Sequence, residues 1–279
     1  MRFKSDSNIS WHHNWDRIDN TIDPGWFVKF LDSSRLKQLE LIKKNPAEYF
    51  SYLDIKPDLH ILDLGCGTGI LLHPLAELVG KKGRIVGVDI SDFMIHEARK
   101  RAEITDMPLE FYKGNVYSLD FSENVFDRAT CSTLFQHLKR PDEALNEIKR
   151  VVNHGGLISI FDHDWESLVI NSTYDNISKL ISRYFCSHLK NGKAGKQLKE
   201  IFVSSGMNII RSYDIQINLS YDEFLNSGIG FYQSVQHCVD DGIISVEQKQ
   251  MWLNDLAEKN ERGIFRFELC GYRVVGRKE

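Results

Sequence analysis

The chain has 279 residues, of which 42% are hydrophobic and 27% charged, and its formal net charge is −4. This balance is typical of a globular protein and argues against disorder, and the slightly acidic total lacks the basic footprint of a nucleic-acid-binding protein. The five cysteines are scattered without a CxxC pair, and no apolar run reaches membrane-spanning length, so we expect a cytoplasmic protein without a disulfide framework, zinc knuckle or membrane contact.

The first 57 residues are expected to form an N-terminal helical lid. Trp26, Phe27 and Phe30 share one face of a predicted helix, and Asn45-Pro46 interrupts the helical pattern. Aromatic rings are concentrated in this segment, which also contains Trp11, His12, His13 and Trp15.

From residue 60 the pattern changes to short apolar strands that alternate with amphipathic helices. The predicted strands cover residues 60–64, 84–89, 109–112, 125–131 and 157–161, and the predicted helices cover about 68–79, 91–102 and 141–152. Residues 153–156, with two glycines, are expected to end the last of these helices. Strands and helices in alternation predict a parallel sheet with helices on both faces.

The remainder of the chain predicts more helices and two further strands. A helical stretch is expected at about 174–204, a strand at about 207–217, amphipathic segments at about 221–240 and 246–260, and a closing strand at 265–273. The stretch between the last two strands is too long for a hairpin loop. We therefore predict a helical cap inserted at about 218–262, before the last strand.

A glycine-rich turn follows the first predicted strand, in the run Asp63-Leu64-Gly65-Cys66-Gly67-Thr68-Gly69. Glycines at such a turn allow the backbone to bend sharply and to approach a ligand closely. The spacing is GxGxG, which fits neither the dinucleotide motif GxGxxG nor a Walker loop. Asp89 ends the second predicted strand, where a carboxylate can accept both hydrogen bonds of a ribose diol.

Five runs of sequence carry a family resemblance: ILDLGCGTG (61–69), VGVDIS (86–91), YKGNVYSLDF (112–121), FDRATCSTLFQHL (126–138) and EIKRVVNHGGLISIFD (147–162). Together they resemble class I S-adenosylmethionine-dependent methyltransferases, and most of all the small-molecule subgroup that includes the ubiquinone and menaquinone methyltransferases. The resemblance implies a Rossmann-like, doubly wound α/β fold with a mostly parallel seven-stranded sheet, in which residues 58–279 form the methyltransferase domain and its cap. It also implies an enzyme with S-adenosyl-L-methionine as its cofactor.

The same resemblance implies roles for single residues. Asp63 and the turn Gly65-Cys66-Gly67 would surround the methionine part of the cofactor, and Asp89 would hold the ribose. The adenine would lie against Ile90, with its edge at Asn115 and Val116, where the family commonly has Asp at position 115. An Asn carbonyl can still accept from the exocyclic amine of adenine. Thr130 and Ser132 would lie beneath the sulfonium.

Methyl transfer from a sulfonium is an in-line displacement, so alignment of the reactants can carry most of the catalysis, and a general base is needed only for some acceptors. His137, just after the fourth strand, is the first candidate base, although a structural role in packing on the cofactor or capping the next helix is slightly favoured. His163 is the second candidate, since the flanking Asp162 and Asp164 are expected to raise its basicity. We assign no metal site, because neighbouring residues of an extended chain point to opposite sides.

Trp15, Trp26, Phe224 and Tyr232 are candidate contacts to the methyl acceptor, with packing within the lid or the cap as the alternative interpretation. Gly228 and Gly230 interrupt a helical pattern and predict a hinge or gate in the cap.

These features predict a methyltransferase of a small, apolar or aromatic metabolite, acting at O, N or C, as a monomer or homodimer. Three alternatives stay open at this point: a protein methyltransferase, a cyclase or pericyclase that binds the cofactor without using its methyl group, and a non-catalytic cofactor-binding protein.

Overall fold

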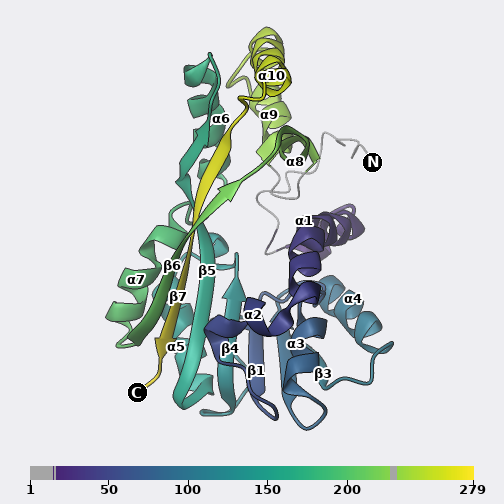
Figure 1. Ribbon diagram of the computed structural model, residues 1–279, viewed down its shortest axis with the longest axis vertical. Helices are drawn as coiled ribbons and strands as arrows, with labels where there is room; N and C mark the ends of the chain where they lie inside the picture. Colours follow the sequence, from purple (N-terminus) through teal and green to yellow (C-terminus); the bar gives the residue numbers. More distant parts are fainter. Residues whose placement is uncertain (1–14, 16, 227–230) are drawn as a thin grey trace.

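The computed structural model describes residue 15 and residues 17–226 and 231–279. Its centre is a seven-stranded sheet with the strand order β3-β2-β1-β4-β5-β7-β6 (Figure 1). The strands are β1 (His60–Leu64), β2 (Arg84–Asp89), β3 (Leu109–Lys113), β4 (Phe126–Ser132), β5 (Val152–Ile170), β6 (Asn208–Asn218) and β7 (Phe267–Arg277). The pairs from β3 to β5 are parallel, and β7 runs antiparallel to both β5 and β6. The predicted doubly wound, mostly parallel sheet is confirmed.

Helices cover both faces of this sheet because the central strands are apolar on both sides. On one face lie α3 (Leu72–Val79) and α4 (Asp92–Ala102), and on the other lie α5 (Pro141–Val151) and α7 (Ala194–Ser204). In β1, Ile61 packs toward the first pair of helices and Leu62 toward the second, and neither side chain is exposed. This alternation places the two halves of the core on opposite sides of one sheet.

Several predicted boundaries need correction. The helix expected from residue 68 begins at Leu72, and the stretch 174–204 is two helices, α6 (Asp175–Ser187) and α7. Residues 153–156 belong to β5, which is 19 residues long, and β7 continues past residue 273 to Arg277. The physical reason is long-range pairing, since β5 and β7 are matched from Leu157 with Arg277 to Ile170 with Phe267.

The long strands β5, β6 and β7 extend beyond the parallel part of the sheet and carry a helical cap at one end of the molecule (Figure 1). The cap contains α6, α8 (Tyr221–Asn226), α9 (Phe231–Asp240) and α10 (Val246–Glu261). Its core is separate from that of the sheet and includes Trp165, Phe185, Phe224 and Trp252. The cap is therefore built from two stretches of chain, one on each side of β6, and the predicted insertion at 218–262 covers only the second.

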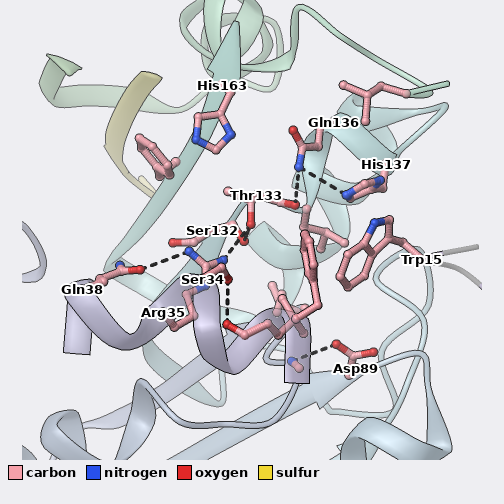
Figure 2. A pocket seen from close by; sticks show the side chains of 18 of the residues that line it. Trp15, Ser34, Arg35, Gln38, Asp89, Ser132, Thr133, Gln136, His137 and His163 are labelled. Atoms are coloured by element: carbon pink, nitrogen blue, oxygen red, sulfur yellow. Dashed lines mark hydrogen bonds between the residues drawn. The ribbon is translucent and has the colours of Figure 1, made fainter. Parts of the chain in front are cut away.

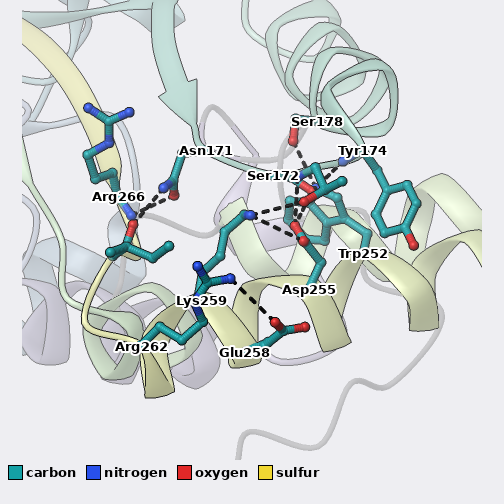
Figure 3. Close-up of polar contacts among 12 residues, drawn as sticks. Asn171, Ser172, Tyr174, Ser178, Trp252, Asp255, Glu258, Lys259, Arg262 and Arg266 are labelled. Carbon is teal, nitrogen blue, oxygen red and sulfur yellow. Dashed lines mark hydrogen bonds and ion pairs between the residues drawn. The ribbon is translucent and has the colours of Figure 1, made fainter.

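Polar contacts join the two stretches of the cap (Figure 3). The Asp255 carboxylate of α10 accepts from Ser172 Oγ at 2.7 Å and from the Thr173 backbone N at 2.8 Å. Trp252 Nε1 donates to Ser178 Oγ at 2.8 Å. Because the buried indole N–H has its partner, α10 and α6 can pack closely without an unsatisfied donor.

The N-terminal segment consists of a short 3-10 turn (Ile18–Asn20), α1 (Pro24–Lys44), α2 (Pro46–Tyr49) and a second 3-10 turn (Ser51–Leu53). Asp19 accepts from Ser91 Oγ and from the backbone N of Asp92 and Phe93, so it caps the start of α4. Further along, the Asp32 carboxylate pairs with both terminal nitrogens of Arg101. These contacts hold α1 over the carboxyl ends of the parallel strands (Figure 1).

None of the described helices has the length and apolar character that a membrane span would need.

Candidate active site

The glycine turn between β1 and α3 is shaped by three residues with left-handed φ angles, Gly65 (69°), Gly67 (52°) and Gly69 (67°). The backbone N of Gly65 donates to Val88 O at 2.8 Å, so the turn is pinned to the end of β2. A Cβ on Gly69 would lie 2.6 Å from the Phe111 ring. Glycine is thus required here both by conformation and by space.

Asp89 connects this turn to the start of α4. Its Oδ2 accepts from the backbone N of Gly67 at 2.9 Å, and its Oδ1 accepts from the backbone N of Ser91 at 3.0 Å. Burial raises the pKa of the Asp89 carboxyl, and the hydrogen bonds from Ser91 and Gly67 oppose that shift. The carboxylate that the sequence singled out therefore organises the edge of the site.

A cavity of about 1220 Å³ opens above the carboxyl ends of β1, β2 and β4 (Figure 2). Of the residues expected to contact the cofactor, seven line it: Gly65, Gly67, Asp89, Ile90, Asn115, Val116 and Ser132. The other three, Asp63, Cys66 and Thr130, line an adjoining cavity of about 70 Å³ that shares the glycine turn with the first. Beyond the strand ends, the large cavity continues between α1 and the base of the cap.

Asp63 lies in the adjoining cavity, close to a residue that the sequence did not single out, Arg35 of α1. Burial raises the pKa of Asp63 to about 7, and the positive charge of Arg35 acts against that shift. Arg35 Nη2 donates to Thr133 Oγ1 at 2.9 Å and its Nη1 to Gln38 Oε1 at 3.1 Å, so both partners are neutral. Nothing in the helical pattern of residues 24–44 marks Arg35, because its place in the site depends on how α1 docks.

Thr133, which accepts from Arg35, has a φ of 60°. A β-branched residue in the left-handed region is strained, and such strain concentrates at functional sites. The backbone N of Thr133 donates to Phe161 O at 2.8 Å, which fixes the end of β4 beside β5.

His137 lines the large cavity from a 3-10 turn, Phe135–His137, and its ring centroid is 5.9 Å from that of Trp15. The Gln136 amide donates to His137 Nε2 at 3.2 Å, and the Gln136 carbonyl accepts from Trp165 Nε1 at 2.6 Å. The lone pair of His137 Nε2 thus already has a donor. This arrangement is compatible with the structural alternative for His137.

His163 also lines the cavity, but it is 8% exposed and its Nδ1 is buried without a hydrogen-bond partner. Burial, with the charges of Arg35 and His137, lowers its pKa to about 3. The expectation that flanking carboxylates raise its basicity is wrong. The Asp162 carboxylate accepts from the backbone N of Gln136 and of His163 instead, and burial raises its own pKa to about 7.

His163 is therefore expected to stay neutral in the folded protein at pH 5, where an unperturbed histidine is mostly protonated. Nitrogen-detected NMR of histidine-labelled protein checks this, with a His163→Asn variant to assign the signal. Since the folded state resists the proton that the unfolded state accepts, this group lowers the free energy of unfolding as pH falls from about 6.5 toward 3. A resonance that titrates near pH 6.5 and is lost in the variant contradicts the placement.

Of the four candidate acceptor contacts, Trp15 lines the cavity and the other three do not. Trp26 stacks on Phe30 with ring centroids 5.0 Å apart. Phe224 is 1% exposed and Tyr232 packs edge-on against it, both within the cap. The helical spacing of Phe224 and Tyr232, which suggested that they contact the acceptor, results from packing within the core of the cap. The cap side of the cavity is lined instead by Trp165, Phe185, Leu189, Ile217 and Leu219.

Trp11, His12, His13, Gly228 and Gly230, for which the sequence suggested a lid contact or a hinge, lie outside the described residues. Among the residues that are described, no three His, Cys, Asp or Glu side chains are grouped so that they could hold a metal ion.

Comparison with known proteins gives one family match. A model of the methyltransferase domain matches residues 55–206. The chain is 28% identical over 232 residues to an uncharacterized 37.1 kDa protein in transposon Tn4556 of Streptomyces fradiae, covering 82% of this chain and 66% of that protein. It is 33% identical over 112 residues to demethylmenaquinone methyltransferase of Bacillus cereus, covering 40% of this chain and 47% of that enzyme. The chain thus spans less than two thirds of either relative.

Among solved structures, a SAM-dependent methyltransferase from Aquifex aeolicus superimposes with a TM-score of 0.55 at 21% identity, covering 70% of this chain and 94% of that one. At this identity the likeness concerns the fold alone.

Proposed function

Because the chain belongs to the methyltransferase-domain family, we propose that it is an S-adenosylmethionine-dependent methyltransferase that acts on a small, apolar or aromatic metabolite. The observation that carries the proposal is the glycine turn bound to Asp89 at the carboxyl edge of the sheet, opening into one large cavity. Ligands of open α/β sheets bind at this edge.

The residues at the edge fit the cofactor chemically. Asp89 would hold the ribose, and Asn115 and Val116 would contact the adenine beside Ile90, all on the wall of the large cavity. The methionine part carries an ammonium group, a carboxylate and a sulfonium. Asp63, a partly buried carboxylate that forms no ion pair with a described residue, suits the positive groups, and Arg35, whose hydrogen-bond partners Gln38 and Thr133 are neutral, suits the carboxylate. The sequence predicted Asp63 at the methionine part of the cofactor but gave no sign of Arg35.

The rest of the cavity supports a separate acceptor site. When bound, the cofactor supplies an electrophilic methyl group; the work left to the protein is to align the acceptor and exclude water. The volume of about 1220 Å³ exceeds the usual range for one small-molecule pocket, which reaches about 1000 Å³. We assign α1 the role of a lid over both ligands, since it lines the cavity with Leu31, Ser34 and Arg35. His137 would orient the acceptor, and it could take the proton of the acceptor only after Gln136 leaves Nε2, whereas His163, with its low pKa, would act as a neutral hydrogen-bonding group.

Incubation of the protein with methyl-labelled cofactor and a metabolite extract tests the function. Labelled small-molecule products are expected, and label in protein would instead indicate a protein methyltransferase. Cofactor that binds but keeps its methyl while a metabolite is converted would indicate the cyclase alternative. No binding of S-adenosylhomocysteine in calorimetry would remove all cofactor-based functions.

Binding of S-adenosylmethionine at pH 7 is expected to release protons. The Asp63 carboxyl has a pKa of about 7, so it is about half protonated at that pH, and nearby positive charge lowers its pKa and expels the proton. S-Adenosylhomocysteine lacks the sulfonium charge and should release fewer protons. Calorimetry in buffers of different ionisation enthalpy measures the number at pH 7, where the α-amino group of the cofactor is still mostly protonated in solution.

Asp63→Asn is expected to remove most of the proton release. Asp162→Asn is the matched control, because it removes the other carboxyl with a pKa of about 7 and should leave most of the release in place. Equal proton release by Asp63→Asn and wild type would show that Asp63 does not face the cationic part of the cofactor.

A further inference from the structure

A second guanidinium group, that of Arg273 in β7, lies on the wall of the large cavity and does not line the smaller one. In the sheet, β7 is separated from β1 by β4 and β5, and Arg273 is absent from the smaller cavity that holds Asp63, so we place it with the acceptor. Its side chain is 7% exposed. The cavity therefore has a nearly buried cation in its wall, in addition to Arg35 at the glycine turn.

The protein partners of Arg273 are all neutral. Arg273 Nη1 donates to Ser159 Oγ at 3.0 Å, and the guanidinium carbon lies 3.9 Å from the ring centroid of Tyr52 and 5.3 Å from that of Phe161. Burial raises the pKa of Tyr52, which keeps it a neutral phenol. Within the part of the chain that the structure describes, no carboxylate lies within ion-pair distance of Arg273.

A buried charge without a counter-ion is costly, and proteins pair such groups with an opposite charge or with a ligand. A hydroxyl and two ring faces compensate a guanidinium only in part. The planar fork of the guanidinium matches a planar oxyanion in two hydrogen bonds, a match that no neutral acceptor reproduces.

The walls around Arg273 are apolar and aromatic. Phe161 lies against the guanidinium, and Trp165, Phe185, Ile217 and Leu219 continue the wall toward the cap. Such a surface favours a flat hydrophobic frame. This part of the wall thus combines apolar and aromatic side chains with one nearly buried positive charge.

We infer that the methyl acceptor is an aromatic compound that carries a planar oxyanion, either a carboxylate or the ionised oxygen of a phenol or enol, and that Arg273 binds this group. The inference rests on the proposed function and names the acceptor class of the same site. Arg273 is then a specificity-determining residue, and its loss should change which acceptors bind without removing the cofactor.

Binding of three naphthalene probes to the complex with S-adenosylhomocysteine tests the inference by calorimetry and fluorescence. 2-Naphthoate is expected to bind the wild-type complex about tenfold or more tightly than its neutral isostere naphthalene-2-carboxamide. 2-Naphthol, followed by the emission of its anion, is expected to ionise at lower pH when bound. If only 2-naphthoate is preferred over the carboxamide, the acceptors are carboxylates. If only the ionisation of bound 2-naphthol shifts to lower pH, they are phenols or enols. If neither effect is found, the inference is overturned.

Arg273→Gln should bring the affinities of naphthoate and the carboxamide to within about twofold, while Arg273→Lys keeps part of the preference. Arg277→Gln is the matched control, because it removes the same charge from an exposed position at the end of the same strand. A preference that survives in Arg273→Gln would mean that Arg273 only joins Tyr52 to the sheet. If Arg273→Gln does not fold, the comparison of the probes in the wild-type protein and in Arg273→Lys still tests whether Arg273 binds the oxyanion.

The affinity of each variant for S-adenosylhomocysteine separates this inference from the proposed function. If the wild-type protein does not bind S-adenosylhomocysteine, the proposed function is wrong. If it binds S-adenosylhomocysteine but shows no preference between the probes, only the inference about Arg273 is wrong.

Discussion

An Asp89→Ala variant is expected to bind S-adenosylhomocysteine about a hundredfold or more weakly than the wild-type protein. The carboxylate would accept two hydrogen bonds from the ribose, and hydrogen bonds to a charged group contribute about 1.5–3 kcal/mol each. The variant also loses the acceptor for the backbone N of Gly67, so the glycine turn becomes less well ordered. Calorimetric titration of the purified variants measures the affinity.

Two further variants control this result. Asp89→Asn keeps an acceptor for the Gly67 N–H and should be intermediate. Asp92→Ala removes a carboxylate three residues away, whose partner is the exposed Lys113, and should leave the affinity within about threefold of wild type. Melting temperatures show whether Asp89→Ala is folded. A folded Asp89→Ala with wild-type affinity would place the ribose elsewhere in the cavity.

Most of the cofactor side of the site could be predicted because its residues lie in local sequence motifs, and the family resemblance of those motifs implied the roles of Asn115 and Ser132. An apolar run predicts each strand, and parallel strands have their carboxyl ends at the same edge of the sheet. Gly65, Asp89, Asn115 and Ser132 lie at the end of four such runs or within two residues after it, and all four line the cavity. No knowledge of distant contacts was needed to group them.

Arg35 on the cofactor side and the whole acceptor side could not be predicted in this way, because they depend on how separate elements dock. Arg35 reaches the site because α1 docks there, held against α4 by Asp19, Asp32 and the packing of Phe27 and Phe30 on Met94. Phe224 and Phe185 belong to the same apolar cap core, yet only Phe185 faces the cavity. The low pKa of His163 likewise arises from burial. The sequence shows the neighbouring carboxylates Asp162 and Asp164 but not this burial, so it predicted a shift of the pKa in the opposite direction.

A Gly195→Ala variant is expected to lose about 3 kcal/mol or more of its free energy of unfolding. Gly195 lies in the first turn of α7, where the helix contacts β5. A Cβ there would lie 2.4 Å from the backbone O of Asp162 and 2.8 Å from the backbone C of His163. Backbone atoms of a central strand cannot move aside as a flexible side chain can, so α7 and β5 must separate.

Helix propensity alone predicts the opposite sign, since alanine in a helix is favoured over glycine by about 0.5–1 kcal/mol. The measurement therefore decides between two effects, and we expect the steric one to win. Gly192→Ala is the matched control in the preceding loop: its Cβ would meet its nearest neighbour, Cys186 Cβ, at 3.6 Å, an ordinary contact, and the change should stay below about 1 kcal/mol.

Urea unfolding of the two variants tests the packing of α7 on β5, and the site gives a second readout. The segment before Gly195 is tied to the cavity wall, because the backbone N of Asn191 donates to Gln136 O and Gly192 O accepts from the backbone N of Trp165. Separation of α7 from β5 should therefore disturb Gln136 and the neighbouring His137 as well as the stability. A Gly195→Ala protein as stable as wild type would show that α7 packs less closely on β5 than the structure has it.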